Sequence, residues 1–189
     1  MTGPLLVDHG HLVYRVIRQR WQDPLDASHS RGRTDNRWNT QAFQALYACC
    51  SERVARAVAL DVFRLSGVEL EDLNADVRPA LVEITWSGTV VDVASADGVI
   101  AAGFPPTYPA GISVSETQHA ATAWHRAGLE GIVCRSASLA RFGFAEWKDP
   151  HPPWGEIAIF PQNAKHAPHR RRRRADLDWL RAEPPTAHA

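Results

Sequence analysis

The sequence has few cysteines and no excess of charge of one sign, and both shortages exclude classes of protein. Its three cysteines are the adjacent pair Cys49 and Cys50 and the distant Cys134, which fits neither a disulfide framework nor a zinc site. Lysine and arginine number 21, as do aspartate and glutamate, so the chain lacks the positive field typical of nucleic-acid and membrane-surface proteins. A reducing cytoplasm is the compartment that we expect.

Long apolar runs and common enzyme motifs are missing as well. No stretch approaches the roughly 20 apolar residues of a membrane-spanning helix, and the N-terminus lacks the basic start and apolar core of an export signal. The sequence contains no GxxxxGK[ST], GxGxxG, HExxH or GxSxG motif. Its nine histidines lack metal-ligand spacing. We therefore expect a soluble protein without a metal centre.

What is present is enough for one compact domain, since 44% of the 189 residues are hydrophobic. Apolar runs and alternation predict strands at Leu12–Ile17, Phe43–Ala48, Ala80–Trp86, Gly88–Val93, Gly131–Ser136 and Glu156–Phe160. Capping residues predict two helices, Glu52–Leu65 after Ser51 and before Gly67, and Glu116–Ala127 before Gly128. This mixture indicates an α+β fold with mixed or antiparallel sheets and packed helices.

Two long segments without periodicity and the basic C-terminus complete the expected organisation. The segment Gln19–Asn39 is predicted to be a functional loop, and Ala94–Ser115, rich in glycine and proline, a flap. We expect a domain over residues 1–162 and a basic tail over 163–189. The tail contains the run Arg170–Arg174 and then a short amphipathic stretch, which would either cap the domain or lie on a partner.

Four pieces of sequence stand in an informative order. They are VYR (Val13–Arg15), RWN (Arg37–Asn39), LYA (Leu46–Ala48) and GLEGIVCRSAS (Gly128–Ser138). In this order, and followed by a strand that ends in Phe160, they resemble the RES domain, the toxin half of many bacterial toxin–antitoxin pairs. The resemblance implies an ADP-ribosyltransferase-like fold and NAD as substrate, with no tightly bound cofactor. It also implies a cognate antitoxin of Xre type, through which alone the protein would reach nucleic acid.

The residues in these pieces suit the chemistry that the resemblance implies. Cleavage of the nicotinamide–ribose bond builds positive charge on the ribose, so a site needs phosphate anchors, an aromatic wall and negative charge. Arg15 and Arg37 would grip phosphate oxygens, and Tyr47 would stack on nicotinamide. The other expected site residues are Ser136, which would hydrogen bond the ribose or the amide, Asn39, which would fix the RWN loop, Tyr14 and Arg33.

The carboxylate is where the sequence departs from the family pattern. The family usually places a glutamate eleven residues after the tyrosine of the Leu-Tyr pair, and that position is Val58. Asp61 lies one helical turn later and Glu52 about one and a half turns earlier. Either side chain would be displaced along the helix, Asp61 by about 5 Å, so the substitution alters, slows or abolishes the reaction.

The first hypothesis is a toxin that depletes NAD as a glycohydrolase or phosphorylase and that an antitoxin neutralises. The acceptor of ADP-ribose stays open among water, phosphate and a protein side chain; the last would make the protein a mono-ADP-ribosyltransferase. Depletion ranks first because no target-recognition module is visible. One rival is a nucleotide-binding protein that has lost catalysis, and another is a scaffold whose basic tail binds nucleic acid.

Overall fold

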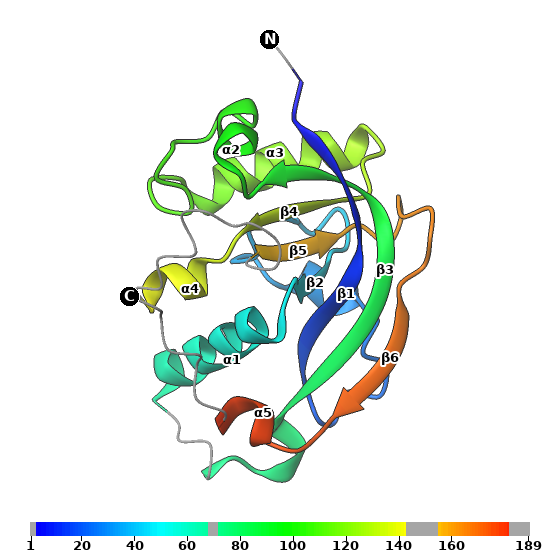
Figure 1. Cartoon of the computed structure of the whole chain (residues 1–189), viewed down its shortest axis with the longest axis vertical. Helices are drawn as coiled ribbons and strands as arrows, with labels where there is room; N and C mark the ends of the chain where they lie inside the picture. Colours follow the sequence, from blue (N-terminus) through cyan, green and yellow to red (C-terminus); the bar gives the residue numbers. More distant parts are fainter. Residues whose placement is uncertain (1–2, 68–71, 143–154, 182–189) are drawn as a thin grey trace.

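A six-stranded mixed sheet organises the protein (Figure 1). The computed structural model describes residues 3–67, 72–142 and 155–181. The strands are β1 (Leu6–Arg18), β2 (Leu46–Cys49), β3 (Pro79–Val93), β4 (Gly131–Arg135), β5 (Gly155–Ile159) and β6 (His169–Arg174). The helices are α1 (Glu52–Ser66), α2 (Ala96–Ala101), α3 (Val114–Arg126), α4 (Ala137–Arg141) and α5 (Asp178–Arg181), with 3-10 turns at Ser28–Gly32 and Ala75–Val77.

The strand order is β1-β2-β5-β4-β3-β6, and β1 also pairs with β3. That extra pairing runs from Leu6 opposite Val91 to Arg18 opposite Pro79, so five strands form a closed circuit and β6 lies outside it on β3. The β3–β4 pair is parallel and the other pairs are antiparallel. The expected α+β class with a mixed sheet is confirmed.

Alternate residues of the strands enter different hydrophobic clusters. One face of the sheet is covered at one end by α2 and α3 and at the other by α1 and α5 (Figure 1), with Trp124 and Trp179 among the buried side chains. The opposite face packs inside the strand circuit, where Val82 and Ile157 meet Ala27 of the loop after β1. Each face of the sheet therefore carries buried hydrophobic residues.

The two predicted helices form where their caps indicate. The Ser51 side chain accepts a hydrogen bond from the Val54 N–H at 3.2 Å, and Gly67, at φ 62°, ends α1 in the left-handed conformation that glycine adopts without strain. At α3, Ser113 and Glu116 form a reciprocal capping box. No helix in the described ranges is both long and apolar enough to cross a membrane.

The central strand corrects the prediction of two separate strands. Residues Pro79–Val93 form one continuous strand, β3, through the expected break at Gly88. A Cβ atom at this position would lie 2.5 Å from Cζ2 of Trp86, so the glycine makes room for the indole ring and does not mark a turn. The expected flap also differs, because α2 occupies residues 96–101 before the proline-rich part.

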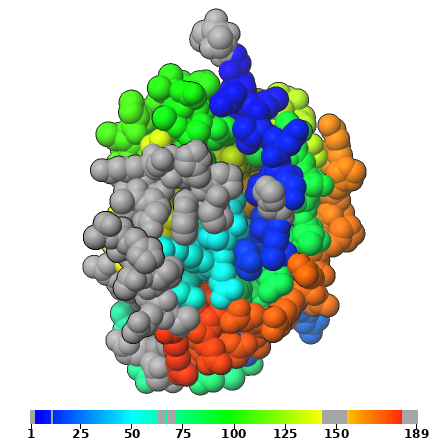
Figure 2. Space-filling view, viewed as in Figure 1, coloured from blue at the N-terminus to red at the C-terminus, as the bar shows by residue number. Residues whose placement is uncertain are grey.

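The basic segment expected to be a tail belongs to the sheet and to the core. β6 pairs antiparallel with β3, with Arg174 opposite Leu81 and His169 opposite Thr85. In α5, Trp179 is 1% exposed and packs in the cluster of α1. Figure 2 shows β6 and α5, in orange and red, along the right and lower edges of the surface. The amphipathic stretch therefore caps the domain, while residues 182–189 lie outside the described part of the chain.

Candidate functional site

Two pockets adjoin at one end of β2. The first, here called the Arg15 pocket, has a volume of about 220 Å³ and is lined by Arg15, Val16, Trp21, His29, Ser30, Arg33, Asn36, Ala45 and Tyr47. The second, the Glu156 pocket, has a volume of about 190 Å³ and is lined by Asp35, Asn36, Arg37, Trp38, Tyr47, Tyr108, Cys134, Arg135, Ala137 and Glu156. Asn36 and Tyr47 line both, so the pockets share a wall and together suit a ligand with two ends.

Arg15 is the buried cation of the first pocket. It lies on β1 with 8% of its surface exposed, and its guanidinium lies 5.9 Å from the centre of the Trp21 ring. One nitrogen, Nη2, donates to the Asp26 carbonyl oxygen at 3.1 Å, whereas Nη1 has no hydrogen-bond partner among the described residues. Burial lowers the pKa of Arg15 to about 10, opposed by nearby Asp26 and Asp23. The side chain is still charged at neutral pH and has a donor to offer.

Tyr47 is fixed by a hydrogen-bond network in the wall between the pockets. Its hydroxyl accepts from the Trp38 backbone N–H and donates to Asn39 Oδ1, each at 2.9 Å. Asn39 is fully buried and donates to the Ser30 carbonyl oxygen at 2.9 Å, and Asn36 donates to the same oxygen at 3.0 Å. Burial raises the pKa of Tyr47 far above its usual value, so the side chain is a neutral, immobile ring.

Glu156 is the acidic group of the second pocket. It lies on β5 beside Cys49 of β2 and Cys134 of β4, and the nearby Ser136 side chain lowers its pKa. Burial raises the pKa of Glu156, while the Ser136 hydrogen bond and the charges of Arg37 and Arg141 oppose the rise. A partly buried carboxyl group that faces a pocket is a common arrangement in catalytic sites.

Arginines hold the loop that closes the second pocket. Arg135 is buried and donates to the carbonyl oxygens of Ala94, Pro106 and Tyr108 at 2.8 to 3.1 Å. Arg37 donates to the Pro109 carbonyl oxygen at 3.4 Å. The loop after α2, expected to be a flap, is therefore held beside the Glu156 pocket by three of these hydrogen bonds, to Pro106, Tyr108 and Pro109.

The sequence matches the RES domain over residues 12–180. The chain belongs to the RES domain family. A chain of the M. tuberculosis MbcT–MbcA toxin–antitoxin complex has the same fold: it superposes with a TM-score of 0.70 and 16% identity, over 89% of this chain and 85% of that one. No curated protein matches the sequence. The family resemblance seen in the four sequence pieces is confirmed.

The RES fold brings most of the expected binding residues to the two pockets. Arg15, Arg33 and Tyr47 line the first, and Arg37 and Tyr47 line the second. Arg33 is exposed and binds Asp35 through two hydrogen bonds of 3.0 and 2.6 Å. Asn39 supports Tyr47 from beneath, and Ser136 caps α4 next to Glu156.

Three expected residues lie elsewhere in the structure. Tyr14 projects from the opposite face of β1 to Arg15 and packs in the cluster of α1. Glu52 is paired with Arg174 of β6 at 3.0 Å, and Asp61, 4% exposed, is paired with Arg141 and accepts a hydrogen bond from Ser138 at 3.0 Å. None of the three lines either pocket. Both acidic side chains of α1 are thus bound by cations of the chain itself.

Glu156 is the site residue that sequence reasoning missed. The signal that drew attention to Arg15, a single charge inside a short apolar strand, is also present in the strand that contains Glu156. The place of this charge in the site follows only from the strand order of the sheet, because β5 lies between β2 and β4. Trp38 is buried and donates from Nε1 to the sulfur of Cys134 at 3.2 Å.

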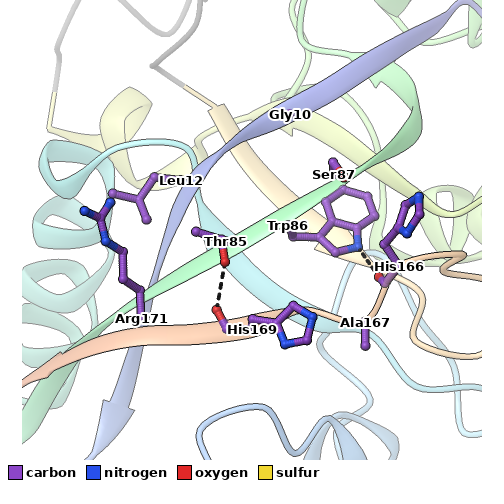
Figure 3. A pocket seen from close by; sticks show the side chains of 9 residues that line it. All are labelled: Gly10, Leu12, Thr85, Trp86, Ser87, His166, Ala167, His169 and Arg171. Carbon is purple, nitrogen blue, oxygen red and sulfur yellow. Dashed lines mark hydrogen bonds between the residues drawn. The ribbon is translucent and has the colours of Figure 1, made fainter.

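A third pocket, of about 390 Å³, lies apart from these two and shares no residue with them. Figure 3 shows its walls on β1, β3 and β6, where the Trp86 indole N–H donates to the His166 carbonyl oxygen and the Thr85 hydroxyl to that of His169. It contains no acidic residue. Within the described residues, no three histidine, cysteine, aspartate or glutamate side chains could hold a metal ion.

Proposed function

We propose that this RES domain is a toxin that binds NAD across the two pockets and cleaves the nicotinamide–ribose bond. The observation that carries the proposal is Arg15, a buried guanidinium that lines the first pocket and whose Nη1 has no partner in the part of the chain that the structure describes. Leaving a buried donor unpaired costs about 1–3 kcal/mol. A ligand with acidic oxygens would remove that cost, and the pyrophosphate of a dinucleotide supplies them.

Tyr47, in the wall that the two pockets share, would lie between the two halves of the bound NAD. With the pyrophosphate at Arg15 and the exposed Arg33, the nicotinamide end would cross Tyr47 into the Glu156 pocket. The neutral ring of Tyr47, held by Trp38 and Asn39, would form the flat surface on which nicotinamide stacks. A rigid site of this kind holds the scissile bond in place without further ordering of the protein.

We further propose that water or phosphate accepts the ADP-ribose and that an antitoxin protein blocks the toxin in its host. The RES family membership and the fold shared with a chain of a toxin–antitoxin complex support the antitoxin. Depletion of NAD ranks above modification of a protein target because the described chain folds as one domain around one sheet and shows no separate module that would recognise a target.

Nicotinamide release from NAD is the experiment that tests the proposal. Purified protein is mixed with NAD, with and without inorganic phosphate, and the products are separated. We expect nicotinamide and ADP-ribose, or a phosphorylated ADP-ribose when phosphate is the acceptor. Absence of nicotinamide under both conditions would contradict the proposed reaction.

One observation favours a second candidate, a nucleotide-binding protein without turnover. The usual family glutamate is Val58 here, and the two neighbouring acidic residues of α1 are both occupied by arginines. Titration calorimetry with ADP-ribose separates the two candidates, because binding without any nicotinamide release supports only this one.

A further inference from the structure

We infer that Glu156 is the catalytic carboxylate of this site, an inference that rests on the proposed NAD cleavage. It lies on β5, in the part of the sheet where the sequence pattern expected only an apolar strand. Four lines of observation, on position, partners, environment and chemistry, lead to this assignment.

Position comes from the register of the sheet. Tyr47 is opposite Ala158, and Cys49 is opposite Glu156. Residues two apart on a strand project from the same face, so Glu156 and Tyr47 lie on one face of neighbouring strands, as diagonal neighbours roughly 7–8 Å apart at Cα. Both line the Glu156 pocket. A ring stacked on Tyr47 would bring its ribose within reach of the carboxylate.

The partners of Glu156 distinguish it from the other acidic residues near the site. Asp61 is bound by Arg141, Glu52 by Arg174, and the exposed Asp35 by Arg33. Glu156 has the Ser136 side chain nearby, and no described lysine, arginine or histidine forms an ion pair with it. Of the two acidic residues that line the Glu156 pocket, Glu156 is therefore the one that is not ion-paired within the described part of the chain.

The surroundings of Glu156 strengthen the electrostatic effect of its negative charge. Glu156 is flanked by Cys49 and Cys134 on the two adjacent strands, and both thiols are buried and free. In a weakly polar wall of this kind, a carboxylate interacts with a developing positive charge more strongly than it would in water. The same burial raises the pKa of Glu156, which makes its carboxylate a stronger base than that of an ordinary glutamate.

The chemistry is then complete in atoms and charge. The bond between C1 of the ribose and the nicotinamide nitrogen breaks, and its electron pair leaves with neutral nicotinamide. The Glu156 carboxylate stabilises the resulting ribosyl cation and accepts a proton from the attacking water, whose oxygen bonds to C1. Glu156 returns that proton to solvent, so the products are nicotinamide, ADP-ribose and one proton.

The test compares Glu156→Gln with the wild type and with Glu83→Gln, a matched strand glutamate that lines neither pocket. We expect Glu156→Gln to lower the rate of nicotinamide release about 100-fold or more while its Kd for ADP-ribose, measured by titration calorimetry, changes less than threefold. Glu83→Gln should keep the wild-type rate. Release by Glu156→Gln within threefold of the wild type overturns the assignment and leaves the proposed function standing.

Two further measurements test the role of Glu156 even if the Glu156→Gln variant does not fold. The wild-type rate should fall at low pH with an apparent pKa above the usual range for glutamate, and an acid limb at or below that range contradicts the role. Added formate should restore part of the activity of Glu156→Ala, and no restoration in a variant that binds ADP-ribose also contradicts it. If the wild type releases no nicotinamide, the proposed function fails, and the role of Glu156 fails with it.

Discussion

The charged side chains of the pocket region and those of the C-terminal region have opposite relations to the rest of the chain. In the pockets, Arg15 has an unpartnered nitrogen and Glu156 has no ion pair among the described residues. Near β6, Arg173 donates to the carbonyl oxygens of Gln19 and Trp21, and Arg174 binds Glu52. Charged groups that are paired within the chain stabilise its fold, whereas charged groups without such a partner are available to bind a ligand.

Removal of the C-terminal region should have the largest effect, because its charges and buried side chains stabilise the fold. A chain ending at Gln162 would lose β6 and the buried side chains Trp179 and Leu180, which pack against α1. We expect it not to fold, because losing a large core side chain costs about 3–5 kcal/mol and typical total stability is only about 5–15 kcal/mol. Circular dichroism and thermal melting check this. A cooperative transition within a few degrees of the wild type would show that the segment is dispensable.

Arg15→Ala should lower activity strongly without unfolding the protein. A hydrogen bond to a charged group contributes about 1.5–3 kcal/mol, so the loss of the phosphate contact proposed for Nη1 predicts about a 10- to 100-fold loss of NAD turnover. Arg172→Ala is the matched control, because Arg172 is exposed on β6. Steady-state rates of both variants are the measurement. Wild-type turnover in a folded Arg15→Ala protein would remove Arg15 from the site.

For Arg174→Ala we expect a loss of stability without a loss of activity. The partly buried pair between Arg174 and Glu52 has side-chain exposures of 22% and 33%, so its loss should lower the free energy of unfolding by about 1 kcal/mol. NAD turnover should stay at the wild-type level, because neither residue lines a pocket. Urea denaturation followed by tryptophan fluorescence measures the change. Equal stability of Arg174→Ala and Arg172→Ala would show that the pair contributes nothing.

The smallest effect is a gain in stability that depends on pH. Because the pKa of Glu156 is raised in the folded protein, protonated Glu156 stabilises the fold below the ordinary value of 4.5, and this contribution is lost as the pH rises through the folded pKa. Glu156→Gln cannot ionise, so it should melt at a higher temperature than the wild type at pH 7 but not at pH 4. A constant difference across this range would show that the carboxyl group is not destabilised by burial.

Local signals were sufficient for the two longer helices, α1 and α3, and for part of the site. Ser51 and Gly67 define the ends of α1 because capping depends on the nearest backbone groups. Arg15, Arg37 and Tyr47 were found because they lie in pieces whose order resembles the RES family, and all three line a pocket.

Features that depend on distant strands were missed. Gly88 lies inside β3 because of the Trp86 ring, which local pattern alone does not place. The two expected carboxylates of α1 are occupied by Arg141 and Arg174, at 80 and 122 residues along the chain from Asp61 and Glu52. Glu156 reaches the site through pairing with β2 and β4, and neither partner is adjacent to it in the sequence.

The position of β6 has a consequence for how molecules of this protein meet one another. β1 to β5 form a closed circuit, and β6 pairs on one side with β3, so among the described strands its outer edge is the one without a neighbour. An open strand edge is a template on which another chain can extend the sheet and aggregate. The edge formed by His169–Arg174 consists of one histidine and five arginines, and a second antiparallel copy would set cation against cation. The arginine run thus protects by repulsion the edge that no other described strand covers.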